Sequence, residues 1–175
     1  MIGNHKNKTL VLGLGNPVLT DDGIGCQVAR ALNKELKEPD IDVMEVNVAG
    51  LDFLELLADY DQAIIIDAIQ TEEGIPGQIY RFEPDVFANT CQTSSPHNIN
   101  FATAITLGKQ LGLPLPQQIA IFAIEVKDAI SFGERCTPDV EAAIPECIRQ
   151  VIQEIKGSHN RAVQLSGIRG LRHGK

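Results

Sequence analysis

Short apolar runs alternate with stretches of helical spacing along most of this 175-residue sequence. The runs TLVLGL, IDVMEVNV, QAIIIDAI, QIYRF and QQIAIFAIEV are typical of β-strands, and QAIIIDAI is apolar enough for a central strand covered on both faces. Between them, GIGCQVARALNKELKE, LDFLELLADY and INFATAITLGKQLGL place apolar residues at helical spacing. Strands that alternate with helices predict a mostly parallel sheet between two helical layers. We therefore expect a three-layer α/β/α fold with about five strands.

Three segments depart from this regular alternation of strands and helices. QIYRF follows the turn residues TEEGIPG, so it could be the second, antiparallel strand of a loose hairpin. The stretch 87–98, FANTCQTSSPHN, has no periodicity and is predicted to be a loop. A final helix should start with Thr137 as N-cap and Pro138 at its first position, and Pro145 should kink or split it.

Length and charge indicate one acidic domain. A chain of this size buries one core, so we expect a single α/β domain over residues 1–156 and a basic, flexible tail over 157–175. The formal net charge is −8, and without the 20 residues from Lys156 onward, which hold five Lys or Arg and no acid, it is −13. An acidic body repels a phosphate backbone, which argues against nucleic-acid binding.

The remaining composition points to the cytoplasm. The start MIGNHKNKTL has no apolar leader, and no segment approaches the roughly 20 apolar residues that a membrane span needs. Four scattered cysteines form no CxxC pair, so they are expected to be small apolar residues rather than ligands or nucleophiles. We expect a cytoplasmic monomer, because helix-on-sheet packing already accounts for the patterned surfaces.

The stretch LVLGLGNPVLTDDGIG leads from the first strand through a glycine-containing loop into a helix. It resembles a nucleotide-binding loop, but Val18 stands where a dinucleotide fingerprint needs its third glycine, and no Gly-Lys-Ser/Thr follows. Asp21 and Asp22 occupy the place of a phosphate. These features argue against an organic cofactor at this loop.

Three side chains at the carboxyl edge of the sheet could form a metal site. Asp22 precedes the first helix, Asp67 follows the apolar residues AIII, and His97 stands in the polar segment SSPHN. Each has an ordinary alternative: a helix cap for Asp22, a carboxylate bonded to backbone N–H groups for Asp67, and a solvated imidazole for His97. Together, two carboxylates and one imidazole would bind nickel or zinc and leave coordination positions open.

Two other polar residues belong to the same edge. Asn16 could turn toward the site or form a bond within its own turn. Glu125 follows the last apolar strand and could line the edge.

The motifs GLGNPVLTDDGIG, IIIDAI, GIPGQIYRF, SSPHN and SFGERCTPDVEAAIP, in this order, resemble those of the maturation endopeptidases of nickel-iron (NiFe) hydrogenases. The resemblance extends to about Ile155 and implies a phosphorylase/hydrolase-like fold. By position it assigns Asp22, Asp67 and His97 to the metal site and to catalysis, with Asp21 as a cap or a supporting residue.

The resemblance also implies a function. A protease of this family removes a C-terminal extension from the precursor of a hydrogenase large subunit after nickel insertion, and the nickel arrives with the substrate. The sequence has no HExxH and no serine-triad motif, so a metal-polarised carbonyl or a metal-activated water would be the simplest chemistry, and the choice between them stays open.

Two other functions fit parts of the sequence. A nickel-dependent binding or chaperone module would use the same ligands without cleavage. A peptidyl-tRNA hydrolase also begins with GLGNP, but VLTDDGIG and the acidic body disfavour it.

Overall fold

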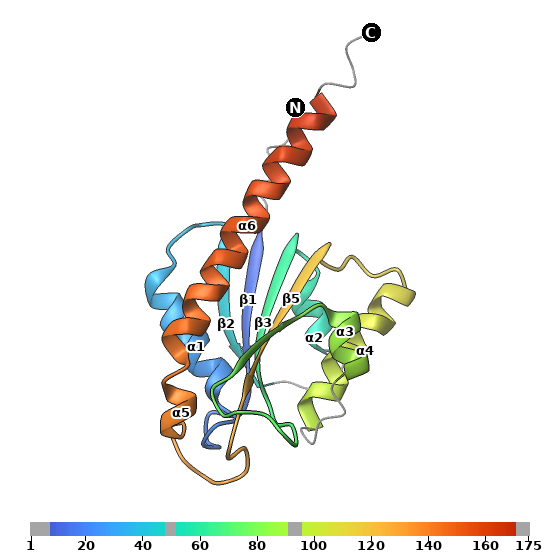
Figure 1. Ribbon diagram of the computed structural model, residues 1–175. Coiled ribbons are helices and arrows are strands. Elements are labelled where there is room, and N and C mark those ends of the chain that lie inside the picture. Colours follow the sequence, from blue (N-terminus) through green and yellow to red (C-terminus); the bar gives the residue numbers. More distant parts are fainter. Residues whose placement is uncertain (1–7, 48–51, 91–95, 171–175) are drawn as a thin grey trace.

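The computed structural model describes residues 8–47, 52–90 and 96–170 (Figure 1). The strands in this part of the chain are β1 (Thr9–Leu14), β2 (Ile41–Val46), β3 (Gln62–Ile69), β4 (Ile79–Phe82) and β5 (Gln118–Glu125). The helices are α1 (Ile24–Glu35), α2 (Asp52–Leu57), α3 (Pro84–Thr90), α4 (Pro96–Gln110), α5 (Pro138–Glu141) and α6 (Ile144–Gly170).

The five strands form one sheet in the order β2-β1-β3-β5-β4. β1 pairs in parallel with β2 and β3, and β3 pairs in parallel with β5. The chain leaves β1 for β2 on one side and returns to β3 on the other. The carboxyl ends of β1 and β3 therefore flank the point where the winding direction reverses, which is where α/β folds bind ligands.

β4 is the antiparallel strand that the sequence predicted, but it has a different neighbour. It pairs with β5, so β5 lies between β3 and β4 and the loose hairpin with the preceding strand does not form. Turn residues in the 70–78 segment indicated a reversal of direction. They carried no information on a partner strand about 40 residues later in the chain.

Helices cover both faces of the sheet, which confirms the expected three layers (Figure 1). Successive side chains of a strand point to opposite faces. Ile64 and Ile66 of β3 pack in the cluster that contains α1, α5 and α6, whereas Ile65 and Ile69 pack in the cluster with α2, α3 and α4. All four side chains are buried, as expected for the most apolar run in the sequence.

Glycines let α1 approach the sheet closely. A Cβ atom at Gly25 would clash with the carbonyl oxygens of Leu14 and Ile66, and one at Gly13 would clash with that of Gly25. Gly15 has a φ of 136°, a conformation that side chains with a Cβ atom rarely adopt. These glycines therefore serve backbone packing and the turn, in place of the phosphate contact that their spacing first suggested.

The segment 87–98 was predicted to be a loop, and this prediction is wrong at both ends. Residues up to Thr90 belong to α3, and α4 begins at Pro96. Phe87 is buried in the core and packs edge-on against Phe82 at 5.5 Å between ring centroids. A seven-residue helix is too short to show periodicity, although Pro84 and Asp85 in its first turn are a typical start signal.

The C-terminal helix is split, as Pro145 predicted. Thr137 is the N-cap of α5, and α6 begins one residue before Pro145. α6 then runs to Gly170, so much of the predicted tail is helical, and its flexibility stays a prediction. Although α6 has 27 residues, no helix in the described ranges is both long and apolar enough to cross a membrane.

Candidate active site

The candidate site lies where the loops after β1 and β3 meet, between the carboxyl ends of these two strands. Gly13 of β1 is paired with Ile66 of β3, directly before Asp67. The loop after β1 carries Asp22, whose charge lies close enough to act on Asp67. The structure therefore brings together two of the three residues that the sequence selected.

Asp67 is a buried carboxylate with one unused oxygen. It is 2% exposed and lies within β3, two residues before the strand ends at Ile69. Its Oδ1 accepts a hydrogen bond from the backbone N–H of Ala68 at 2.8 Å, whereas Oδ2 has no hydrogen-bond donor among the described residues. Burial, the largest cause, and the neighbouring charge of Asp22 together raise the pKa of this carboxyl to about 8, although the Ala68 N–H bond acts in the opposite direction. A buried oxygen without a donor is suited to receive a cation.

The pKa of Asp67 predicts how stability depends on pH. In the unfolded chain the carboxyl ionises near its usual pKa of 3.8, but in the folded protein it keeps its proton to about pH 8. The folded state then binds more protons, so the contribution of Asp67 to the free energy of unfolding should fall by about 1 kcal/mol per pH unit across this interval and level off above it. The Asp67→Asn variant should lack this loss. Urea unfolding at pH 5, 7 and 9 measures the difference, and parallel curves for the two proteins would contradict the prediction.

Asp22 is held by the loop that precedes it. It is 6% exposed, and its Oδ2 accepts a hydrogen bond from the backbone N–H of Asn16 at 2.9 Å. It does not cap α1, because the N-cap is Gly23 and no side chain forms a cap bond there. The helix-cap alternative is therefore wrong, and the carboxylate is fixed beside the switch point.

Asp21 joins two loops that lie far apart in the sequence. It is fully buried, and its two carboxylate oxygens accept bonds from the backbone N–H groups of Lys127, Asp128 and Thr137 and from the Thr137 hydroxyl, at 2.6–3.1 Å. Asp21 thus fixes the Asp22 loop against the segment 127–137. The sequence indicated a supporting role, but it gave no signal for partners more than 100 residues away.

His97 lies in the second position of α4, and not in a loop as the sequence suggested. α4 packs on the face of the sheet to which the side chains of Ile65 and Ile69 point. Asp67 lies between these two residues in the alternation of β3, so it belongs to the same face. Figure 1 shows that α4 begins at the carboxyl edge of the sheet. The helix therefore starts on the side of the sheet to which Asp67 belongs. The imidazole of His97 lies outside the described residues, so its contact with the aspartates stays a prediction.

The described side chains alone do not complete a metal site. Within them, no group of three His, Cys, Asp or Glu is placed to hold an ion. Asp22 and Asp67 supply two carboxylates, and the third expected ligand is His97. The metal assignment of these three residues remains a prediction.

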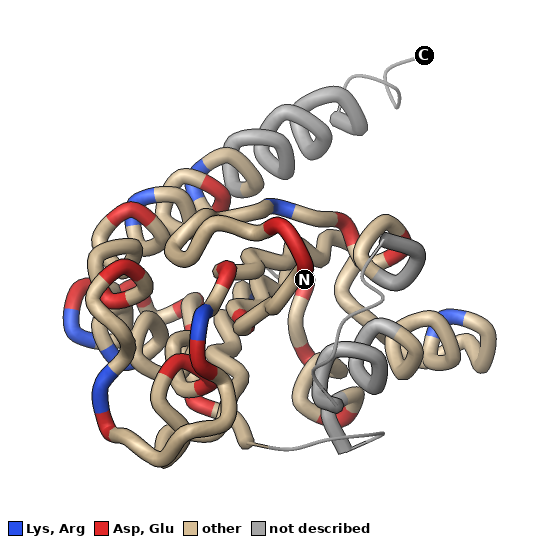
Figure 2. Tube along the Cα trace, turned by 60° about the horizontal axis from the view of Figure 1, so that its bottom comes forward, with Lys and Arg blue, Asp and Glu red and all other residues tan. Residues whose placement is uncertain are grey.

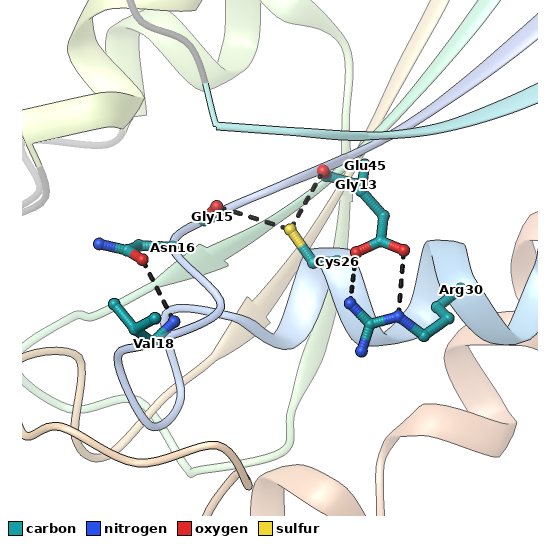
Figure 3. A network of polar contacts seen from close by, with 7 residues as sticks. All are labelled: Gly13, Gly15, Asn16, Val18, Cys26, Arg30 and Glu45. Carbon is teal, nitrogen blue, oxygen red and sulfur yellow. Dashed lines mark hydrogen bonds and ion pairs between the residues drawn. The ribbon is translucent and has the colours of Figure 1, made fainter.

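A small polar network shapes the loop before Asp22 (Figure 3). The Cys26 thiol donates to the carbonyl oxygens of Gly13 and Gly15 at 3.6 and 3.5 Å, and burial raises its pKa to about 11. The side-chain oxygen of Asn16 accepts a bond from the N–H of Val18 at 3.2 Å, which is the bond within the turn that the sequence left as one alternative. Cys26 and Asn16 therefore stabilise the conformation of this loop.

An exposed ion pair links the helix behind this loop to the sheet. Arg30 of α1 forms two bonds to the Glu45 carboxylate of β2, at 3.1 and 2.6 Å (Figure 3). This exposed pair ties α1 to the edge of the sheet.

Glu125 has a structural contact at the same edge. It is 1% exposed and accepts bonds from the N–H and the hydroxyl of Thr71, at 2.7 and 3.1 Å. Its carboxylate also lies where a Cβ atom of Gly74 would be. Glu125 thus anchors the loop between β3 and β4 over the end of β5.

Comparison with known proteins gives consistent matches. A model of the hydrogenase maturation protease family matches residues 26–154. The hydrogenase 2 maturation protease of Escherichia coli is 30% identical over 166 residues, which cover 92% of this chain and 98% of that protein. A putative hydrogenase maturation protease of Methanocaldococcus jannaschii is 32% identical, over 86% of this chain and 98% of that protein.

Solved structures agree with these sequence matches. The hydrogenase maturating endopeptidase HybD from E. coli superimposes with a TM-score of 0.74 at 29% identity, over 86% of this chain and 93% of that one. The HybD protein from Thermococcus kodakarensis has a TM-score of 0.62 at 25% identity, over 83% of this chain and 97% of that one. The chain therefore belongs to the hydrogenase maturation protease family and is a peptide hydrolase.

Proposed function

We propose that this endopeptidase removes the C-terminal extension of a NiFe hydrogenase large-subunit precursor after nickel has been inserted, and that it recognises the nickel that the substrate carries. Asp22, Asp67 and His97 are the residues that would bind this nickel. The single observation that carries the proposal is the Asp67 carboxylate, buried at the switch point with Oδ2 unpaired.

The three proposed ligands are suited to a divalent ion such as nickel that the substrate brings to the site. Two carboxylates and an imidazole are oxygen and nitrogen ligands of the kind that nickel accepts. Three ligands leave positions for groups that the substrate supplies. Two carboxylates close together repel each other, so a divalent cation between them relieves the repulsion.

The chain's own residues would prepare the site for the incoming ion. Asp67 holds a proton up to about pH 8 because it is buried beside Asp22. An approaching cation favours the ionised form, so binding would release this proton. Asp21 and the N–H of Asn16 hold the Asp22 loop in place. A bound divalent ion supplies charge to polarise a carbonyl or to activate water.

The proposal includes a cytoplasmic monomer that acts on one partner, the large-subunit precursor. Both sheet faces are already covered by helices of the same chain, which supports a monomer.

The proposal is tested on the precursor itself. We expect the precursor to lose its C-terminal extension when co-expressed with this protein in nickel-supplied cells, and to keep it in nickel-depleted cells or when the protein is omitted. Intact-mass spectrometry of the purified large subunit reads out all three conditions. Cleavage without nickel would contradict substrate-borne recognition, and an unchanged mass with nickel would contradict the proposed cleavage.

A further inference from the structure

A paired ribbon of two loops projects apolar side chains beside the candidate site. We define this apolar ribbon as residues 18–20 and 130–133. Leu19 and Phe132 form an antiparallel bridge, the N–H of Gly133 donates to the carbonyl of Val18 at 3.1 Å, and the N–H of Thr20 donates to that of Ser131 at 2.9 Å. The two strands of the ribbon are therefore held together by backbone bonds.

The ribbon is braced at the end where it joins Asp21 and Asp128. The Thr20 hydroxyl donates to the Ser131 carbonyl at 2.8 Å, and Oδ1 of Asp128 accepts the N–H groups of Ile130 and Ser131 at 3.2 and 2.9 Å. The N–H of Asp21 donates to the Asp128 carbonyl, and the Asp21 carboxylate accepts the N–H of Asp128, both at 2.9 Å. The ribbon is thus continuous with the loop that carries Asp22.

Side chains on this ordered ribbon are exposed to an unusual degree. Phe132 is 86% exposed, Ile130 is 85% exposed and Val18 is 53% exposed. Single exposed apolar residues are common on protein surfaces, but three on one paired segment next to an active site indicate a binding surface. Phenylalanine is also enriched in the cores of protein interfaces relative to the rest of the surface.

The charges around the ribbon favour a partner segment with basic side chains. Apart from the buried Asp21 and Asp22, the loops 15–23, 70–78 and 126–137 carry four Asp or Glu and two Lys or Arg. In the view of Figure 2, which brings the lower end of Figure 1 forward, acidic positions outnumber basic ones around these loops. A second copy of this chain would bring two acidic edges together, which is unfavourable. A segment with apolar and basic side chains has complementary charge.

We propose that the apolar ribbon docks the stretch of the large-subunit precursor that flanks the cleaved bond, and that this stretch presents apolar and basic side chains. This inference rests on the proposed function, because it takes the precursor as the partner. Phe132 and Ile130 contact the apolar side chains, and the surrounding carboxylates attract the basic ones. The ribbon contributes to substrate binding and not to the chemical step.

Processing kinetics of the nickel-loaded, full-length precursor test the inference. We expect Phe132→Ser and Ile130→Ser to raise KM by about tenfold and to change kcat less than twofold, because they remove contacts that are equal in ground and transition states. The control Leu111→Ser removes a side chain that is 65% exposed just after α4, at the other edge of the sheet, and should change neither constant. Wild-type KM should also rise between about 50 and 500 mM salt.

The following results of these experiments would overturn the inference. A KM equal to wild type in both ribbon variants overturns the docking inference, and a KM that does not respond to salt overturns the basic character of the segment. If the wild type binds the precursor without shortening it, the proposed cleavage fails, and biolayer interferometry then compares dissociation constants of the same variants. Equal constants would again overturn the ribbon inference. A precursor that does not bind at all overturns it as well.

Discussion

The Asp67→Asn variant should fold normally and leave the large-subunit precursor uncleaved, with processing slowed on the order of a thousandfold or more. Asparagine has nearly the same shape, and the N–H of Ala68 can still donate to its side-chain oxygen. It cannot carry the negative charge that a divalent ion requires at the buried Oδ2 position. Intact-mass spectrometry of the precursor against time gives the rate.

Matched variants separate this effect from a general loss of charge. Asp59→Asn removes an exposed carboxylate after α2 and should process the precursor at the wild-type rate. Asp22→Asn and His97→Ala should resemble Asp67→Asn in rate, because they would remove the other two ligands. Circular dichroism and thermal melts verify folding. Normal processing by all three ligand variants would show that the metal-site assignment is wrong.

The same substitution has opposite consequences for function and for stability. Wild-type Asp67 is costly to ionise in the folded protein, so its replacement should stabilise the chain at alkaline pH. A residue that lowers stability and is needed for activity is what is expected of a functional site. A purely structural aspartate would show losses in both measurements.

Local patterns were sufficient to predict most of the fold. TLVLGL and QAIIIDAI coincide with β1 and β3 to the residue, because buried parallel strands are uninterrupted apolar runs. The partner of β4 could not be predicted, since strand pairing between distant segments leaves no local signal. α3 was missed because the burial of Phe87, a tertiary contact, stabilises a helix of only seven residues.

The proximity of two candidate site residues was predictable as well. Asp22 and Asp67 lie close together because parallel strands bring the loops that follow them to one edge of the sheet. The bonding partners of Asp21 and Glu125 could not be predicted, because each accepts bonds from a loop more than 50 residues away. The sequence does not distinguish a carboxylate that accepts backbone N–H groups from one that is available to bind a cation. The structure distinguishes them by the number of hydrogen-bond donors around each carboxylate.

The Gly25→Ala variant should lose about 3 kcal/mol or more of stability. Alanine is the better helix former by about 1 kcal/mol, so propensity alone predicts the opposite sign. The added Cβ atom, however, would lie 2.5 Å from the carbonyl oxygen of Ile66 and closer still to that of Leu14. Both are backbone atoms of paired strands, so neither can move without disturbing the sheet.

Gly157→Ala provides the matched control, because Gly157 lies within α6 and the Cβ atom that alanine adds there would meet no neighbouring atom within 4 Å. It should gain about 0.5–1 kcal/mol from reduced freedom of the unfolded chain. Urea unfolding of both variants measures the two signs. If Gly25→Ala were as stable as wild type, close contact between α1 and the ends of β1 and β3 would not hold the Asp22 loop in place. The glycine-rich opening of the sequence would then need another explanation, whereas a large loss would show that it allows α1 to pack against the sheet beside the candidate site.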